Sequence, residues 1–314
     1  MTVQVVFSVL ASVIICLLAY KKRALNVGGI IAAFPMGVSC VLSGARFTAV
    51  LLGFFISCSF ITAKVGVKAK LAISDPGYAE HKKKGGRTCW QVLASGLVCT
   101  VMAAFHVAHV GSWSDSATLL SSPDFKGQWS WPLIFQSPDT LSTPVMHTGI
   151  YIAFVGTLAF CTADTWASEI GVTSKAKPRL ITTWRVVPPG TNGGVTLLGT
   201  LAGACAGLVI GLFGAFSYDA GGVTFQGSIV ALGIAAGVVG SAIDSLIGAT
   251  LQYSGRDKKT GAIVSDSAPP KNNKNIESVG ARFAVLSNTQ VNLVTSIIVC
   301  LISPSLYCFI TGIF

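Results

Sequence analysis

Charged residues are scarce in this chain of 314 residues. Asp, Glu, Lys and Arg together make up 11% of it, whereas 52% is apolar, and an average soluble domain carries about 25% charged residues. Such a chain cannot easily cover a water-facing surface, which excludes an ordinary soluble enzyme and a disordered chain. The 34 glycines show no triplet period, so collagen is excluded as well. The composition predicts a polytopic membrane protein.

Cysteine pairing motifs are missing too. The nine cysteines are an odd number, form no C-x-x-C pair, and all but Cys89 lie inside apolar runs. This pattern fits neither a zinc site nor a disulfide framework, and we expect the cysteines to act as small apolar residues. The 4 histidines are scattered, and we expect no catalytic histidine.

Acidic residues are few: 12 Asp and Glu stand against 22 Lys and Arg, giving a formal net charge of +10. A basic patch on a folded surface would suggest a nucleic-acid partner. Here the basic residues lie between apolar runs instead, which indicates membrane topology. We therefore expect no nucleic-acid partner.

Eight stretches are long and apolar enough for membrane helices, which need about 20 residues each. We predict helices because strands would leave backbone groups unpaired in lipid. The stretches are 3–20, 25–44, 46–63, 89–110, 147–170, 195–216, 227–252 and 287–313. The first is followed by Lys21, Lys22 and Arg23 in place of a small-residue cleavage site, so we interpret it as a span and not as a signal peptide.

The basic residues predict the orientation, because cytosolic loops carry an excess of Lys and Arg. With eight spans, all but two of the 22 basic residues, Arg46 and Lys126, fall on one side. That side carries three basic loops, 64–88, 172–194 and 254–286. The loop 111–146 falls on the opposite side. We predict an all-α helical bundle that forms a single integral membrane domain (1–314), with both termini on the non-cytosolic side.

Three acids, Asp164, Glu169 and Asp244, lie inside or at the end of predicted spans. Each needs a partner or a wet cavity, because a carboxylate within the bilayer costs at least ~2.5 kcal/mol. By helical rise, Asp164 and Asp244 lie roughly 9–12 Å below the predicted cytosolic boundary. A shared site on two helices requires such equal depth. The alternative is that these acids pair with buried hydroxyls or lysines and only hold helices together.

The segment 172–196 follows Glu169 and joins basic residues to a glycine-rich helix start. Positive charge comes from Lys175, Lys177 and Arg179, and the helix start contains Asn192, Gly193, Gly194 and Thr196. Glycine amides and a helix N-terminus favour a phosphate, and carboxylates with phosphate oxygens favour Mg²⁺. Further candidates for a substrate phosphate are Asn26, Lys64, Lys68 and Arg87. Alternatively, the loop is a basic segment that contacts anionic lipids.

Glycines recur every four residues in the two spans that follow this loop. They are Gly199, Gly203, Gly207 and Gly211 in the first, and Gly233 and Gly237 in the second. Small residues at this spacing let helix backbones approach closely within lipid. We predict that these stripes form the frame that holds Asp244 near Asp164.

The run ADTWASEIG…SKAKPRLITTWRVVPPGTNGGVTLLGTLAG at 163–203 resembles the transmembrane protein 19 family, the membrane family that includes plant phytyl-phosphate kinase. The similarity extends to LNVGGIIAAFPMG (25–37), GGRTCWQVLASG (85–96) and DSLIGATLQ (244–252). It is also distantly similar to CTP-dependent dolichol and phytol kinases. By this likeness Asp164 and Glu169 belong to an acidic motif, and Asn192–Gly194 to a phosphate loop.

The resemblance implies a Mg²⁺-dependent kinase that transfers the γ-phosphate of a nucleoside triphosphate, with CTP as the expected donor, to an isoprenyl monophosphate. In this hypothesis Asp164, Asp244 and Glu169 serve the metal, and Lys175, Lys177, Arg179 and the Asn192–Gly194 amides hold nucleotide phosphates. The site would lie at the cytosolic boundary of an endomembrane such as the endoplasmic reticulum, in preference to a plastid envelope. The alternatives are a secondary transporter that uses the intramembrane acids for ion or proton coupling, and a lipid-binding scaffold.

Overall fold

The computed structural model describes residues 2–21, 24–65, 86–110, 143–218, 226–265, 275–281 and 284–312. Within these ranges the chain forms eight long helices, and each predicted span corresponds to one of them. The helices are α1 (Thr2–Lys21), α2 (Val27–Ser43), α3 (Ala45–Lys64), α6 (Cys89–Val110), α7 (Thr143–Gly171), α8 (Leu197–Tyr218), α9 (Gly227–Leu251) and α10 (Asn288–Thr311). Six of them are long and apolar enough to cross a membrane, and α1 and α2 contain shorter apolar segments.

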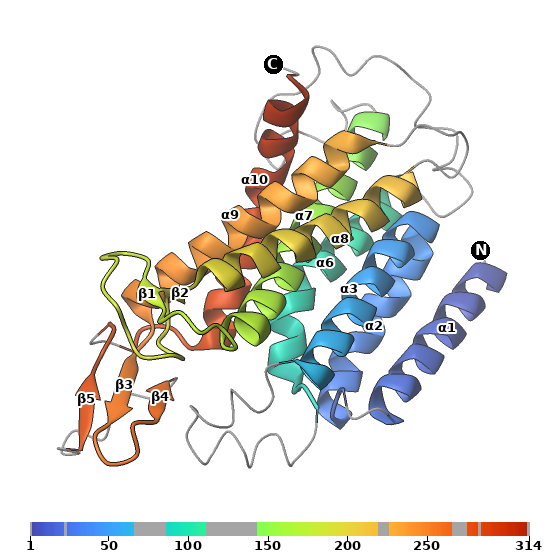
Figure 1. Ribbon diagram of the computed structural model, residues 1–314. Coiled ribbons are helices and arrows are strands. Elements are labelled where there is room, and N and C mark those ends of the chain that lie inside the picture. The colour runs from blue at the N-terminus through green and yellow to red at the C-terminus, as the bar shows by residue number, and fades with distance from the viewer. Residues whose placement is uncertain are drawn as a thin grey trace.

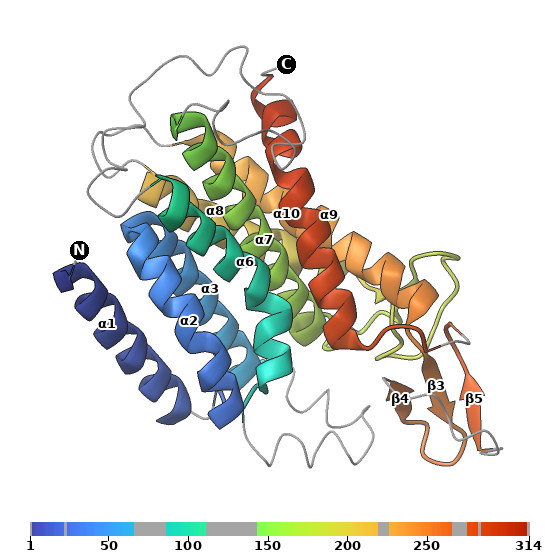
Figure 2. The same cartoon turned by 180° about the vertical axis from the view of Figure 1, so that it is seen from behind.

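The helix α7 is the centre of the bundle. It contacts α3, α6, α8, α9 and α10, and its side chains Tyr151, Phe154 and Leu158 are fully buried. They pack with Phe47 of α3 and Ile210 of α8 in the main apolar core. In Figures 1 and 2 the helix α1 lies at the edge of the bundle, beside α2. The central position of α7 explains why its polar residues are enclosed by protein and not by lipid.

The predicted glycine stripes do bring helices into close contact. A Cβ atom added at Gly199 would lie 3.2 Å from the Ala167 carbonyl oxygen of α7. Further along α8, Gly207 packs directly on Gly233 of α9, and a Cβ at Gly211 would lie 2.9 Å from the backbone of Val230. The stripe of α8 therefore begins against α7 and continues against α9. It fixes the positions of the two helices that carry Asp164 and Asp244.

Both chain termini lie at one end of the bundle, as Figures 1 and 2 show. The opposite end, where α1 is followed by α2 and where the strands lie, is called the basic end below. It carries the described parts of the three basic loops, as the alternation of spans predicts. The membrane side that it faces remains a prediction, as does the single-domain organisation. The predicted loop 111–146 falls largely outside the described residues, and α7 begins at Thr143, within the predicted loop.

Two of the basic loops contain short strands that the helical pattern does not predict. The strand β1 (Arg179–Leu180) pairs antiparallel with β2 (Gly194–Val195). In the last loop β3 (Ser254–Asp257) pairs with β4 (Ile263–Ser265) on one side and with β5 (Ile276–Ser278) on the other. The membrane part is helical as predicted, and the strands confine these loop segments to defined positions beside the helix ends (Figure 1).

Candidate functional site

A cavity of about 1640 Å³ lies within the bundle, towards its basic end. Asp164 and Glu169 line it from α7, and Asp244 lines it from α9. The segment Gly190–Thr196, before α8, and the first turns of α10 complete its polar walls. The sequence-predicted acids thus meet at one cavity, in spite of the 80 positions that separate Asp164 from Asp244.

The helix α10 orients both aspartates. Asn292 Nδ2 donates a hydrogen bond to Asp164 Oδ2 at 3.2 Å, and Thr295 Oγ1 donates one to Asp244 Oδ2 at 3.4 Å. Asn292 and Thr295 are three residues apart, so they lie on the same face of α10. Two carboxylates that line one cavity, each with a hydrogen-bond donor beside it, are typical of a site for a cation.

Asn292 is a site residue that the sequence argument missed. Its side-chain oxygen Oδ1 is buried, has no hydrogen-bond partner among the described residues, and belongs to a residue that lines the cavity. Asn288 lines the same cavity one helical turn earlier. The sequence does contain a pattern that could have indicated this residue: two asparagines four residues apart, on one helix face, at the start of the last apolar span.

Glu169 lines the same cavity as the two aspartates. Its side chain is 8% exposed, within the last turn of α7. In the described part of the chain no group of three or more His, Cys, Asp or Glu side chains is arranged to hold a metal ion. The described structure thus does not arrange Asp164, Asp244 and Glu169 as three ligands of one ion, and their role at a metal stays a prediction. Asp164, Asp244 and Glu169 all line the one cavity, and Asn292 is hydrogen-bonded to Asp164.

The oxygen donors at this point fit Mg²⁺. The ion is usually held by one or two carboxylates, and substrate phosphates and water complete its octahedral shell. Asp164 and Asp244 would supply the carboxylates, and the buried Oδ1 of Asn292 a neutral oxygen. Carboxylate and amide oxygens are hard donors, which suit Mg²⁺ better than softer metals.

Arg87 places a positive charge at the same cavity. Its guanidinium Nη2 donates to Thr165 Oγ1 at 3.4 Å, next to Asp164 on α7. Its backbone is fixed by two hydrogen bonds to the turn before α2: Arg87 N donates to Ala24 O at 2.8 Å, and Asn26 N donates to Arg87 O at 3.1 Å. The short bridge ties the start of α6 to the start of α2, which keeps the guanidinium in place.

The structure does not place the other three candidates for a substrate phosphate, Asn26, Lys64 and Lys68, at the cavity. The side chain of Asn26 accepts a hydrogen bond from Gly29 N at 2.8 Å, so it caps α2, and it is not among the lining residues. Lys68 and the side chain of Lys64 lie outside the described residues. Of this group the structure brings only Arg87 to the cavity.

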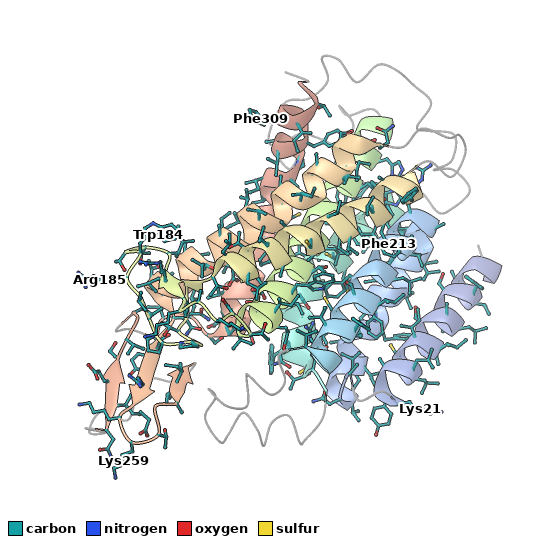
Figure 3. The ribbon with its side chains drawn as sticks, viewed as in Figure 1. Lys21, Trp184, Arg185, Phe213, Lys259 and Phe309 are labelled. Carbon is teal, nitrogen blue, oxygen red and sulfur yellow. The ribbon has the colours of Figure 1, made fainter. Side chains whose placement is uncertain are left out.

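The basic residues of the segment 172–196 face away from the cavity. Ser174, Ala176 and Pro178 line it, while the alternate residues Lys175, Lys177 and Arg179 are exposed. Arg179 Nη1 donates to Trp184 O at 2.8 Å and closes the tip of the loop. Figure 3 shows Trp184 and Arg185 at this tip, away from the helices. The predicted role of the three cations in holding nucleotide phosphates is therefore not supported by their positions.

The predicted phosphate loop is anchored to the end of α9. Asn192 Nδ2 donates to Tyr253 O at 2.9 Å, and Asn192 N donates to Ser254 Oγ at 3.0 Å. Gly194 N donates to Thr191 O at 3.0 Å. Gly193 has φ of 74°, a conformation that favours glycine, and a Cβ there would lie 2.6 Å from Ser245 O. Two of the three predicted amides thus hold the loop, so they are less suited to bind a phosphate.

The start of α8 completes the polar wall. Thr196 lines the cavity and caps the helix, since Thr196 Oγ1 accepts from Gly199 N at 3.0 Å. The first turn of α8 brings the positive end of its dipole to this wall, an arrangement that favours an anion. Carboxylates, a guanidinium and a helix N-terminus therefore surround one cavity, which can accommodate a cation together with a phosphorylated ligand.

The six helices that are long and apolar enough to cross a membrane, packed around one apolar core, define an integral, multi-pass membrane protein. A family model described as "Integral membrane protein DUF92" matches residues 10–300. The chain belongs to this family, which confirms the resemblance seen in the sequence. No solved structure matches the chain.

Curated relatives extend across kingdoms. Protein PGR of Arabidopsis thaliana is 34% identical over 298 residues, covering 93% of this chain and 92% of the relative. A protein of Methanocaldococcus jannaschii named as an uncharacterized membrane protein is 28% identical over 310 residues, covering 98% and 95%. Protein VTE6, chloroplastic, of Arabidopsis thaliana is 26% identical over 234 residues, covering 73% and 56%. With a chloroplastic protein among the relatives, the expected preference for the endoplasmic reticulum has no support.

Proposed function

We propose that this protein is a membrane kinase that phosphorylates an isoprenyl monophosphate to the diphosphate, using the γ-phosphate of a nucleoside triphosphate such as CTP. The observation that carries the proposal is the placement of Asp164 and Asp244 in one cavity with Arg87 and the N-terminus of α8. The resemblance to the family that includes plant phytyl-phosphate kinase supports the substrate class.

The reaction needs positioning and charge neutralisation more than covalent help. An oxygen of the acceptor monophosphate attacks the γ-phosphorus, the bond from that phosphorus to the β-phosphate oxygen breaks, and the nucleoside diphosphate leaves. The acceptor is already an anion, so no side chain has to remove a proton from it. Stabilisation of the transferring group by fixed positive groups then dominates the rate.

The chain's own residues divide this work. Asp164 and Asp244, oriented by α10, bind the cation, and Mg²⁺, when bound, neutralises phosphate oxygens. Arg87 holds the acceptor phosphate beside Asp164, and the first turn of α8 favours the phosphates of the nucleotide. Glu169 lies about one and a half turns beyond Asp164 on α7 and lines the same cavity, so it adds a third carboxylate to the site.

The test is a transfer assay with the purified chain, labelled CTP or ATP, Mg²⁺ and a panel of prenyl monophosphates. We expect a labelled prenyl diphosphate, and we expect Asp164→Asn to lower its rate by about 10²–10³-fold, the loss that follows removal of one charge-stabilising group. Absence of diphosphate with every acceptor, or normal turnover by Asp164→Asn, would overturn the proposal. Ion flux in proteoliposomes without nucleotide would favour the transporter instead.

Asp257→Asn is the matched control, since it makes the same chemical change outside the cavity. Backbone amide hydrogen bonds from Thr260 and Lys259 lower the pKa of Asp257, so this carboxylate is charged at neutral pH. Asp164 would carry the same charge as a ligand of the proposed cation. It lies in β3 and does not line the cavity. We expect Asp257→Asn to retain the wild-type rate within about twofold, as surface changes usually do.

A further inference from the structure

The cavity continues from the polar site into an apolar compartment between four helices. We call this part the apolar arm. Its walls come from α1, α2, α3 and α6, and they include Ile15, Cys16, Ala33, Met36, Leu52 and Phe55. None of these side chains is charged. The same cavity therefore has one end lined by carboxylates, amides and a guanidinium, and another lined mainly by uncharged, apolar side chains.

Arg87 stands where the two ends meet. On one side its guanidinium contacts Thr165 of α7. On the other side its backbone pairs with Leu25 and Ala24, at the start of the apolar arm. A ligand with an anionic group at Arg87 would thus have the polar site on one side and the apolar arm on the other.

The apolar arm also opens sideways. Ile56 and Phe60 of α3 line the cavity, yet they are 61% and 56% exposed. They lie in a helix that is apolar enough to span a membrane, so their exposed surfaces face lipid. A hydrocarbon chain can enter the arm from the bilayer between α3 and its neighbours, without passing through water.

We propose that the apolar arm holds the hydrocarbon tail of the acceptor lipid, and that the side chains of α2 and α3 within it set the length of tail that the protein accepts. The inference rests on the proposed function for the identity of the headgroup, a monophosphate at Arg87. A fully water-soluble acceptor would make no apolar contacts with the walls of the arm. An amphiphile with one anionic end would place its anionic group at Arg87 and its hydrocarbon tail in the arm.

The first test narrows the arm. Ala33 of α2 is half-buried and lines the cavity. Ala33→Phe should lower kcat/KM for phytyl monophosphate by about tenfold or more, because even one methylene in an apolar pocket changes discrimination by about 10–200-fold. The kcat/KM for geranyl monophosphate, which has a shorter tail, should stay within about twofold of the wild-type value. Ile31→Phe is the matched control on the same helix, since Ile31 is 70% exposed and does not line the cavity.

A second test does not depend on turnover. A phytyl monophosphate that carries a diazirine at the end of its tail is photolysed with the wild-type chain, and the labelled peptides are identified by mass spectrometry. We expect adducts in α2 or in residues 51–60 of α3. Adducts confined to any other part of the chain would overturn the proposal, as would an equal loss for both tail lengths, or no loss, in Ala33→Phe.

The two tests also separate the proposals. If the wild-type chain makes no diphosphate but the tail still labels α2 or α3, the kinase function fails and the apolar arm stands as a lipid site. If it makes diphosphate from both lipids and the label lies elsewhere, the kinase function stands and the arm proposal fails.

Discussion

The two ends of α7 both bury polar side chains, but they bury them differently. Towards the basic end, Asp164 lines the cavity and interacts with Asn292. Towards the other end, His147 Nδ1 lies 2.7 Å from His106 Nε2, and its Nε2 lies 3.4 Å from Arg46 Nη1. The side chains of Arg46, His106 and His147, called the histidine cluster below, are all buried, and none lines the cavity.

Aromatic packing accounts for the difference. The ring of Phe47 lies 4.7 Å from the ring of His106 and 6.5 Å from that of His147, measured between centroids. Tyr151 and Phe154 of α7 pack on the same ring. The histidine cluster is thus enclosed by core side chains, whereas the aspartates are open to a ligand. Access to a cavity, and not polarity within a span, distinguishes a candidate site from a structural contact.

The largest contrast in transfer rate should come from two arginines, Arg87 at the cavity and Arg46 in the histidine cluster. Arg87→Gln removes the cation that we assign to the acceptor phosphate, and we expect transfer to fall by about 10²-fold, with a raised KM for the prenyl monophosphate. Arg46→Gln removes a cation of the histidine cluster. We expect it to retain transfer within about threefold but to lower the temperature of unfolding, because it breaks a buried polar contact. Transfer rates and thermal unfolding of both variants in detergent check this.

The reverse pattern would contradict the comparison. If Arg46→Gln abolished transfer in a folded chain, the histidine cluster would have to act in the reaction. If Arg87→Gln left KM and kcat unchanged, the acceptor phosphate would have to bind elsewhere in the cavity.

A smaller effect should come from the loop that closes the polar end. Gly193→Ala places a Cβ on a residue with φ of 74° and within 2.6 Å of Ser245 O. The backbone conformation alone costs about 1–2 kcal/mol, and the contact would displace the loop from α9. We expect a lower unfolding temperature and reduced transfer. The control is Gly227→Ala, where the added Cβ meets nothing within 4 Å; equal behaviour of the two variants would show that the anchor of the loop is dispensable.

Much of this architecture follows from hydrophobic run length and glycine spacing. The eight helices and the close packing of α8 with α7 and α9 could be predicted because each rests on a pattern local to one or two spans. The equal depth of Asp164 and Asp244 follows from helical rise alone, and their shared cavity agrees with it.

What could not be predicted depends on side-chain direction and on partners far along the chain. The alternation that points Ser174 inwards and Lys175 outwards comes from the irregular backbone of the loop, which composition does not reveal. The amide of Asn192 donates to Ser254, 62 residues further along the chain. The amide of Gly194 donates to Thr191 within the loop itself. Asn292 lies beside Asp164 because α10 packs against α7, a contact that the sequence does not reveal.

The most direct test of the central claim is cation binding by the aspartate pair. Mn²⁺, as a probe for the Mg²⁺ site, is titrated into purified wild-type chain and followed by electron paramagnetic resonance of the free ion. We predict that Asp244→Asn and Asn292→Ala each weaken binding by about 10–100-fold, the usual effect of changing ligands or their neighbours. His147→Asn should bind Mn²⁺ as the wild type does. Wild-type affinity in Asp244→Asn, or a loss confined to His147→Asn, would contradict the assignment of this cavity as the functional site.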